Sequence, residues 1–332
     1  MVTNNTRARR WPTAMALGAI LALLGLNGQL RADEFPSRSI TLIVPFAAGG
    51  SSDSVMRIVA RKASESMKQT IIIENKPGGG GNVAALAIKH ATPDGYLLMM
   101  GHSGTHAVNP LLYTDLKFDP VKDFQPVAAL ISFNNILVVP ESSPAKSVAE
   151  LIALAKSKPD GASFASQGVG TIGHLLGETL ARQTGAKLVH VPYRGVAPAL
   201  TDLVAGRVDM MFSSYISAAG YIQSGKLRML AIAGAHRNEQ IADIPTMAEA
   251  GYPNVDFEQW FGVFAPAGTP TPIVRKLNAE FTRALLSNDV KTLVVSQAAT
   301  TIPGTPEDLD ALVQRDIVRL GKVVKESGAT AQ

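Results

Sequence analysis

Cysteine is absent from this 332-residue chain, and aromatic residues make up only 6% of it. Without cysteine the protein has no disulfide framework, no thiolate nucleophile and no zinc site built on thiolates. The scarcity of aromatic rings argues against the stacking platforms that bind single-stranded nucleic acid, so we expect no nucleic acid partner. Beyond residue 32, no segment has the roughly 18 uninterrupted apolar residues that a membrane-spanning helix needs.

The composition is otherwise that of a globular protein, with 46% hydrophobic and 17% charged residues. Such a chain can bury a large core and is not disordered over most of its length. A single core stops growing at roughly 250 to 300 residues. The length of 332 residues therefore predicts two domains.

The excess positive charge lies in the first 32 residues. The formal net charge is +4, and residues 1–32 hold four arginines and no acid, which leaves the remainder with 27 basic and 27 acidic residues. Because an apolar run at 14–26 follows the first arginines, residues 1–32 are predicted to be a signal peptide. Cleavage after Ala32 would leave Asp33 as the first residue of an exported protein. The alternative, an uncleaved anchor, is disfavoured because a run of 13 apolar residues is too short to span a bilayer.

Short apolar segments alternate with helical patterns from residue 40 onward, which is typical of a parallel sheet with crossover helices. Residues 40–101 predict the order β-α-β-α-β, and residues 163–233 predict a second series of the same kind. Two extended segments punctuated by proline, 127–140 and 257–266, lie between the two halves. We therefore expect an α/β fold of two doubly wound domains, joined by two crossing strands that form a hinge. The predicted domains are 33–133 with 258–332, and 134–257.

Two glycine-rich turns superficially resemble nucleotide-binding motifs. Residues 168–173 match G-x-G-x-x-G after a strand and at the start of a helix. A dinucleotide site also needs an acidic residue about 20 positions later, and residues 187–194 contain neither Asp nor Glu. The turn at 78–81 lacks the Lys and Ser/Thr of a phosphate-binding loop. Neither turn predicts a nucleotide site.

The glycine turns share a position immediately before a predicted helix, at 49–52, 78–82 and 168–171. Backbone N–H groups at a helix N-terminus have no partner within the helix, and several such ends that converge on one crevice can bind an anion without Lys or Arg. The alternative is ordinary helix capping, with Ser51, Ser52 or Asp53 as the N-cap. Both interpretations remain open at this point.

No catalytic constellation stands out in the sequence. Ser103 is not in a G-x-S-x-G elbow, and no other serine is in one. His102 and His106 are four positions apart but lack the H-E-x-x-H pattern of a zinc site. His174 is either a ligand donor or a half-buried helix residue, and Asp53 is better placed for capping than for acid chemistry. We expect no enzymatic activity.

Several segments, taken together and in order, resemble the tripartite tricarboxylate transporter receptors, the Bug family. They are 44–53 (VPFAAGGSSD), 74–82 (ENKPGGGGN), 93–96 (PDGY), 190–195 (HVPYRG), 198–203 (PALTDL), 225–228 (GKLR), 245–251 (PTMAEAG) and 265–270 (APAGTP). The resemblance covers residues 35–330. It implies a periplasmic binding protein fold of type II, with a ligand cleft between the domains and no cofactor.

The function implied by the resemblance is capture of a small carboxylate, either a di- or tricarboxylate or an aromatic acid, by closure of the cleft. The partners would be the membrane permease subunits of a tripartite transporter, with the receptor acting as a monomer. The alternatives are a loaded receptor that signals to a membrane sensor such as a sensor kinase and, from a different class, an enzyme with a cleft. Genomic neighbours would distinguish transport from signalling.

The resemblance also implies which residues bind the ligand. The first turns supply Phe46, Ala48, Gly49, Gly50, Ser51, Asp53, Gly80, Gly81 and Asn82. The loop after the third strand supplies Ser103, Thr105 and Asn109, and the second domain supplies Ser166, Gly170, Thr171, His174, Arg194 and Ser213.

The sequence departs from many relatives in two places. It has QGVGT at 167–171 where they carry SGNGT, and Ser213-Ser214 where Asp-Asn is frequent. Both changes remove polar or acidic groups, so an amino-acid ligand is less expected. Arg194 is the one nearby basic residue. The carboxylate is therefore predicted to be held mainly by backbone N–H groups, hydroxyls and waters.

Overall fold

The computed structural model describes residues 1–3 and 35–331, so nearly all of the predicted signal peptide, and its cleavage site, lie outside the described residues. Residues Met1–Ser37 and Arg38–Gln332 form separate units. All of the helices and strands described below belong to the second unit.

The first predicted β-α-β-α-β series is confirmed. Strand β1 (Ile40–Val44) lies between β2 (Ile71–Asn75) and β3 (Leu97–His102) and is parallel to both. Helices α2 (Ser51–Met67) and α3 (Asn82–Lys89) form the crossovers. Four of the five residues of β1 are buried, as expected for the central strand of a sheet covered on both faces.

The second series repeats this arrangement. Strand β5 (Ala162–Ser166) is parallel to β6 (Leu188–Pro192) on one side and to β7 (Met210–Ser214) on the other. The crossover helices are α6 (Ile172–Thr184) and α7 (Val196–Val204).

Two long antiparallel strands join the series. Strand β4 (Phe124–Pro140) pairs with β9 (Glu258–Pro266) up to the register Asn134↔Glu258, and from Asn135 onward it pairs with β7 and β8 (Leu227–Ala233). The strand order is β2-β1-β3-β9-β4-β7-β5-β6. We call the strands on the β2 side of this partner change, with their helices, the first lobe, and those on the β6 side the second lobe.

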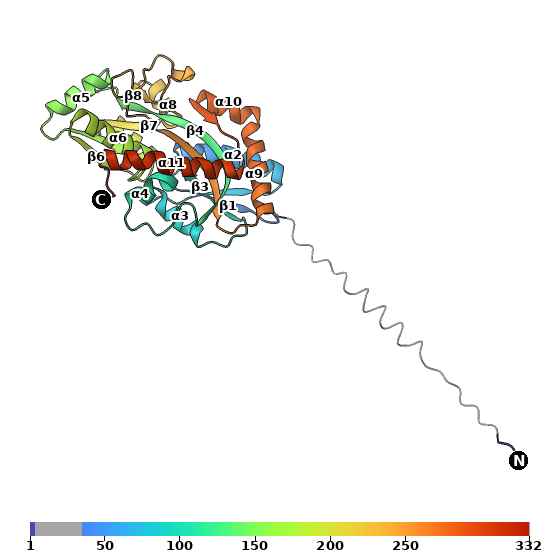
Figure 1. Ribbon diagram of the computed structural model, residues 1–332. Coiled ribbons are helices and arrows are strands. Elements are labelled where there is room, and N and C mark those ends of the chain that lie inside the picture. The colour runs from blue at the N-terminus through green and yellow to red at the C-terminus, as the bar shows by residue number, and fades with distance from the viewer. Residues whose placement is uncertain (4–34, 332) are drawn as a thin grey trace. The chain divides into compact units, whose positions relative to one another are not determined.

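Helix α11 (Pro306–Ser327) runs along both lobes, as Figure 1 shows. Leu309 and Val313 belong to a core cluster of the first lobe, whereas Leu320 and Val324 pack with residues of α6 and β5. The two lobes are therefore connected in two ways: strands β4 and β9 link them through the backbone, and α11 packs on both of them.

A buried polar contact fixes α11 against the crossing strands. The indole Nε1 of Trp260, on β9, donates to Asp316 Oδ2 at 2.8 Å, and the Asp316 side chain is completely buried. Arg315 and Arg319 approach the other carboxylate oxygen at 3.4 and 3.3 Å. Because a buried carboxylate needs compensating partners, these contacts hold one orientation of α11.

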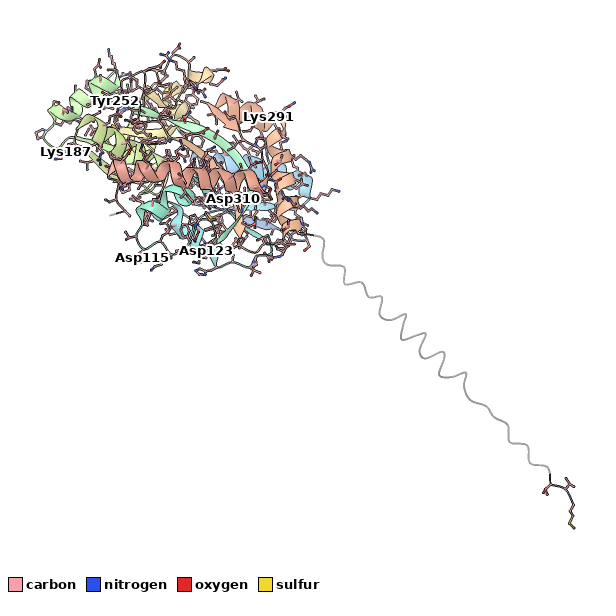
Figure 2. The ribbon with its side chains drawn as sticks, viewed as in Figure 1. Asp115, Asp123, Lys187, Tyr252, Lys291 and Asp310 are labelled. Atoms are coloured by element: carbon pink, nitrogen blue, oxygen red, sulfur yellow. The ribbon has the colours of Figure 1, made fainter. Side chains whose placement is uncertain are left out.

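Figure 2 shows the side chains on both lobes, with Lys187 and Tyr252 labelled on the second lobe and Asp115 and Asp123 on the first. Among the described residues, none of the helices combines the length and apolar character needed to cross a membrane.

The remaining helices and strands are α4 (Asn109–Leu112), α5 (Val148–Ser157), α8 (Tyr215–Gln223), α9 (Thr271–Leu286), α10 (Asn288–Ser296) and β10 (Ala299–Thr301), with short helical turns η1 (Gly79–Gly81), η2 (Gly104–Val108) and η3 (Glu239–Ile241).

Candidate ligand-binding site

The first glycine turn connects β1 to α2 and is held by Asp53. Asp53 accepts a hydrogen bond from the Gly49 amide at 3.0 Å and another from Asn75 Nδ2 at 3.1 Å, and it pairs with Arg57 at 2.9 Å. Burial opposes its ionisation, but Arg57, the Gly49 amide and Asn75 outweigh burial and lower the pKa of the carboxyl. Asp53 therefore positions the turn, and its two carboxylate oxygens are already bonded to these three partners.

The same turn lies against the second lobe. The Ala47 amide donates to the Arg194 carbonyl at 3.1 Å. A Cβ built on Gly50 would lie 2.5 Å from Cγ1 of Val196, the first residue of α7. Only glycine permits this approach, so the two lobes are in contact in the structure.

The N-terminus of α2 meets α8 through a direct hydrogen bond. The Ser51 amide donates to Ser217 Oγ at 2.9 Å, and the Ser214 hydroxyl, at the N-cap of α8, also donates to Ser217 Oγ at 3.0 Å. Within the described part of the chain, the amides of Ser52 and Asp53 make no hydrogen bond. One of the amides that we expected to face a ligand is thus taken by a side chain of the opposite lobe, and two remain available.

The second glycine turn also faces the second lobe. Gly78, Gly79, Gly80 and Gly81 all have positive φ, between 55° and 141°, which other residues rarely adopt. A Cβ on Gly80 would lie 2.1 Å from the carbonyl oxygen of Val169. The close approach of these two backbones explains why this position requires glycine.

Asn109 connects the second turn to the loop after β3. Its Nδ2 donates to Asn82 Oδ1 at 2.6 Å and to the Gly80 carbonyl at 3.3 Å. Its Oδ1 lies against Gly170 of the second lobe and has no hydrogen-bond partner among the described residues. Asn109 therefore presents an unused acceptor at the interface between the lobes.

The loop after β3 is held by its own side chains. Trp260 N donates to Ser103 Oγ at 3.0 Å, and Thr105 Oγ1 donates to the His102 carbonyl at 3.1 Å. The Gly104 amide donates to His102 Nδ1 at 3.0 Å, so the proton of that neutral ring is on Nε2. Burial lowers the pKa of His102 to about 3, although the Gly80 backbone opposes this shift.

His106 has a structural environment rather than that of a metal ligand. Its ring stacks on Phe264 with 3.9 Å between centroids, and Nδ1 lies 2.9 Å from Thr105 Oγ1. Burial lowers the pKa of His106 to about 3, and the nearby His102 adds to this effect. Among the described residues, no group of three His, Asp or Glu could hold a metal ion.

The wall from the second lobe is built around the turn at 166–171. Ser166 Oγ donates to the Gly168 carbonyl at 3.0 Å and lies 2.6 Å from His190 Nε2. Thr171 Oγ1 donates to the same carbonyl at 2.8 Å, and the Gly170 amide donates to His174 Nδ1 at 3.3 Å. These side chains shape the turn that faces Gly80.

A cavity of about 220 Å³ remains where the lobes meet, lined by residues from both of them. Of the residues expected to bind ligand, Phe46, Gly80 and Arg194 line this cavity. Ala48 and Gly49 are exposed beside it, and Asn82 is half-buried. The other expected residues are buried, namely Gly50, Ser51, Asp53, Gly81, Ser103, Thr105, Asn109, Ser166, Gly170, Thr171, His174 and Ser213.

Sequence reasoning missed residues that the fold brings to the same interface. Gln167 lines the cavity, is only 8% exposed, and its Oε1 has no hydrogen-bond partner within the described residues. Tyr113 and Tyr193 also line the cavity. Ser217 and Val196 contact the first glycine turn. Gln167 is part of the 167–171 turn and could have been included on position alone, whereas nothing near Ser217 in the sequence marks it.

Comparison with known proteins identifies relatives over most of the chain. Residues 55–329 match the family described as "Tripartite tricarboxylate transporter family receptor" (TctC). Among solved structures, the periplasmic binding protein BugD is 31% identical with a TM-score of 0.86, and the match covers 89% of this chain and 99% of that one.

Two other solved structures were obtained with ligands. R. palustris Rpa4515 with adipate is 36% identical with a TM-score of 0.86, and the match covers 90% of this chain and 99% of that one. MatC from Rhodopseudomonas palustris with bound malate is 38% identical with a TM-score of 0.84, and the match covers 87% of this chain and all of that one, 100%. The predicted α/β fold of the periplasmic binding protein type is therefore confirmed.

Proposed function

Because the chain belongs to the tripartite tricarboxylate transporter receptor family, we propose that it captures a small carboxylate between its lobes and delivers it to a membrane permease. The observation that carries this proposal is the meeting of two glycine turns with the helix N-termini of the opposite lobe. Gly50 lies against Val196 at the start of α7, and Gly80 lies against Val169 just before α6. Backbone N–H groups at helix N-termini provide positive potential for an anion.

The unused backbone donors at the start of α2 suit a carboxylate. The amides of Ser52 and Asp53 are unused donors within the described residues, and each charge-assisted hydrogen bond contributes about 1.5 to 3 kcal/mol. The Asp53 carboxylate is paired with Arg57, so it is not free to hold the amino group of an amino acid. The adipate and malate named for two similar structures are carboxylates, which supports this ligand class here.

Ligand capture is proposed to involve closure about the crossing strands. The domains are proposed to be 33–133 with 258–332, and 134–257, because β4 changes partner between Asn134 and Asn135. Bending at β4 and β9 would separate the glycine turns from α7 and α8 and open the cleft. Packing of α11 on both lobes limits how far this motion can go.

A thermal-shift screen tests the ligand class directly. The protein would be heated with mono-, di- and tricarboxylates, with aromatic acids and, as a comparison class, with amino acids. A ligand at 100 times its dissociation constant is expected to add about 2.7 kcal/mol to stability. Stabilisation by a carboxylate and none by amino acids is the expected result. Stabilisation by amino acids alone would contradict the proposed ligand class.

Ser217 is proposed to stabilise the closed state without touching the ligand. The Ser217→Ala variant would leave the Ser51 amide without its partner from the opposite lobe. A net loss of about 0.5 to 1.5 kcal/mol corresponds to a dissociation constant raised roughly two- to thirteenfold. Because the bond forms only on closure, the increase should appear mainly as faster release of the carboxylate in stopped-flow measurements.

Ser224→Ala is the matched control for Ser217→Ala. Ser224 is at the end of the same helix, and its hydroxyl is bonded to the Gly220 carbonyl on the surface. This variant should release the carboxylate at the wild-type rate. Equal release rates for both variants and the wild type would exclude the proposed role of Ser217.

The receptor is proposed to be a periplasmic monomer that lacks residues 1–32. The arginines followed by an apolar run in that segment support cleavage after Ala32. Native mass spectrometry of the exported protein should give one copy of a chain that starts at or near Asp33. A retained N-terminus or a stable dimer would contradict the respective part of this proposal.

We propose binding rather than catalysis for the cleft. His102 and His106 are buried with pKa values near 3, which makes them poor proton carriers at neutral pH. Asp53 is engaged by Arg57 and Asn75. Recovery of unchanged carboxylate after prolonged incubation with the protein would agree with this assignment, and its conversion to a product would contradict it.

A further inference from the structure

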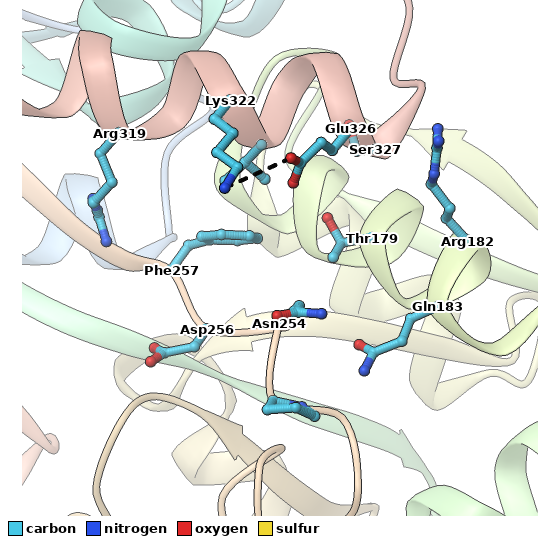
Figure 3. Close-up of a pocket in the computed structure, with 12 residues that line it drawn as sticks. Thr179, Arg182, Gln183, Asn254, Asp256, Phe257, Arg319, Lys322, Glu326 and Ser327 are labelled. Carbon is cyan, nitrogen blue, oxygen red and sulfur yellow. Dashed lines mark ion pairs between the residues drawn. The ribbon is translucent and has the colours of Figure 1, made fainter.

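A second cavity, of about 700 Å³, lies between the C-terminal halves of α6 and α11 and the loop that leads into β9 (Figure 3). The N-terminal end of helix α6 lies at the candidate ligand site, whereas its C-terminal half lines this cavity. From His174 to Arg182 the helix rises about 12 Å. None of the residues that line the cavity is among those expected to bind the transported ligand.

The cavity is preformed. Phe257 from the loop, Leu180 from α6 and Val324 from α11 belong to one buried hydrophobic cluster, which fixes the three walls relative to one another. Its volume is within the roughly 300 to 1,000 Å³ typical of small-molecule sites. A ligand could therefore bind here whether or not the cleft is occupied.

Three cations surround the cavity. Figure 3 shows Arg319 and Lys322 directed from α11 toward Phe257, with Arg182 on α6 at the opposite rim. Arg182 forms no ion pair or hydrogen bond with any residue that the structure describes. Lys322 Nζ forms a long ion pair with Glu326 Oε1 at 3.9 Å, in which no hydrogen bond is made and both side chains stay largely exposed.

Three carboxylates lie nearby, of which Asp316 and Asp256 act on Arg319 and Glu326 pairs with Lys322. Asp316 Oδ1 lies 3.3 Å from Arg319 Nε. Asp256 lies on the floor of the cavity, where burial raises the pKa of its carboxyl and Arg319 opposes that shift. Arg182 has no acidic partner among the described residues, and Lys322 makes only the long ion pair with Glu326, so both keep N–H donors for a further negative charge. We propose that this cavity is a second binding site, for a small organic anion whose carboxylates pair with Arg182 and Lys322.

Citrate is a suitable probe, titrated into the protein at constant ionic strength and followed by backbone amide NMR. Saturable shifts are expected at 179–183, at Asn254 and at 322–327. The double variant Arg182→Gln/Lys322→Gln should weaken this binding by about tenfold or more, because it removes two charge-assisted contacts. Both side chains are exposed, so the variant is expected to fold.

Lys325→Gln is the matched control, since Lys325 is exposed on the same helix and does not line the cavity. It should bind citrate like the wild type. Citrate bound in the cleft would shift residues 49–53 with its own titration curve, which the double variant should not change. The proposal is overturned if residues around the cavity show no saturable shift, or if the double variant binds there like the wild type.

Discussion

Replacing Gly50 with alanine is expected to weaken ligand capture roughly five- to 150-fold, which corresponds to the 1 to 3 kcal/mol that overpacking costs. The backbone of Gly50, with φ −89° and ψ 178°, suits any residue, so the first lobe should fold normally. The added Cβ would lie 2.5 Å from Val196 Cγ1 across the interface. This clash arises only when the lobes close.

Val196→Ala should rescue the Gly50→Ala variant. It removes Cγ1 and leaves the two Cβ atoms 3.8 Å apart, an ordinary contact. Calorimetry with the carboxylate identified by the screen would measure affinity. Small-angle scattering would show whether the radius of gyration falls when ligand is added, as it should for the wild type and the double variant. Wild-type affinity in Gly50→Ala, or no recovery in the double variant, would argue against steric control of closure by this pair.

Arg194→Gln provides the electrostatic comparison. The Arg194 side chain is exposed at the edge of the cavity, and the contact of Arg194 with the first turn is made by its carbonyl. Its replacement should cost less affinity than Gly50→Ala. If Arg194→Gln abolished binding while Gly50→Ala bound normally, the carboxylate would be held by the arginine and not by backbone amides.

The structure changes the reason why glycine is needed in these turns. If these glycines only gave a carboxylate room to reach the backbone amides, a side chain at Gly50 or Gly81 would obstruct the carboxylate. A Cβ at Gly50 instead meets the opposite lobe, and a Cβ at Gly81 would lie 2.1 Å from Thr105 Cγ2 within the first lobe. Gly81 also has φ of 103°, so its replacement would strain the fold. Gly50 therefore gives the cleaner test.

Much of the fold follows from local patterns in the sequence. The apolar run at the start of the sheet became β1, and the extended segments became β4 and β9. These elements were predictable because each carries its own periodicity, length and turn residues. The sequence allowed Ser51, Ser52 or Asp53 as the N-cap of this helix, whereas the N-cap of α2 is Gly50, which has no side chain to make a capping bond.

The contacts between the lobes could not be predicted in the same way. Ser217 and Ser51 are 166 positions apart, and no local rule relates them. Helix α8 was not predicted because the apolar residues of Tyr215–Gln223 do not form one distinct face, and only Ala218 and Ala219 are buried. The sequence indicated which turns carry free amides. It could not indicate that a serine hydroxyl occupies one of them.

Acid is expected to destabilise the protein between about pH 6.5 and pH 3 because two neutral histidines are completely buried. His102 and His106 have folded-state pKa values of about 3, against an ordinary value of 6.5. Below pH 6.5 the unfolded chain binds protons that the folded chain does not. The free energy of unfolding is therefore highest above pH 6.5 and falls with acidification. From pH 7 to pH 5, the two groups together should remove about 4 kcal/mol.

Urea unfolding at pH 7 and at pH 5 measures this effect, and His106→Phe isolates one of the two groups. The phenyl ring preserves the stack on Phe264 but loses the contact with Thr105. This variant should be less stable than the wild type at pH 7. Its free energy of unfolding should nevertheless fall by about 2 kcal/mol less than that of the wild type between pH 7 and pH 5. His90→Gln, at an exposed position, should keep the wild-type pH dependence. An unchanged pH dependence in His106→Phe would mean that His106 accepts a proton in the folded state at a pH well above 3.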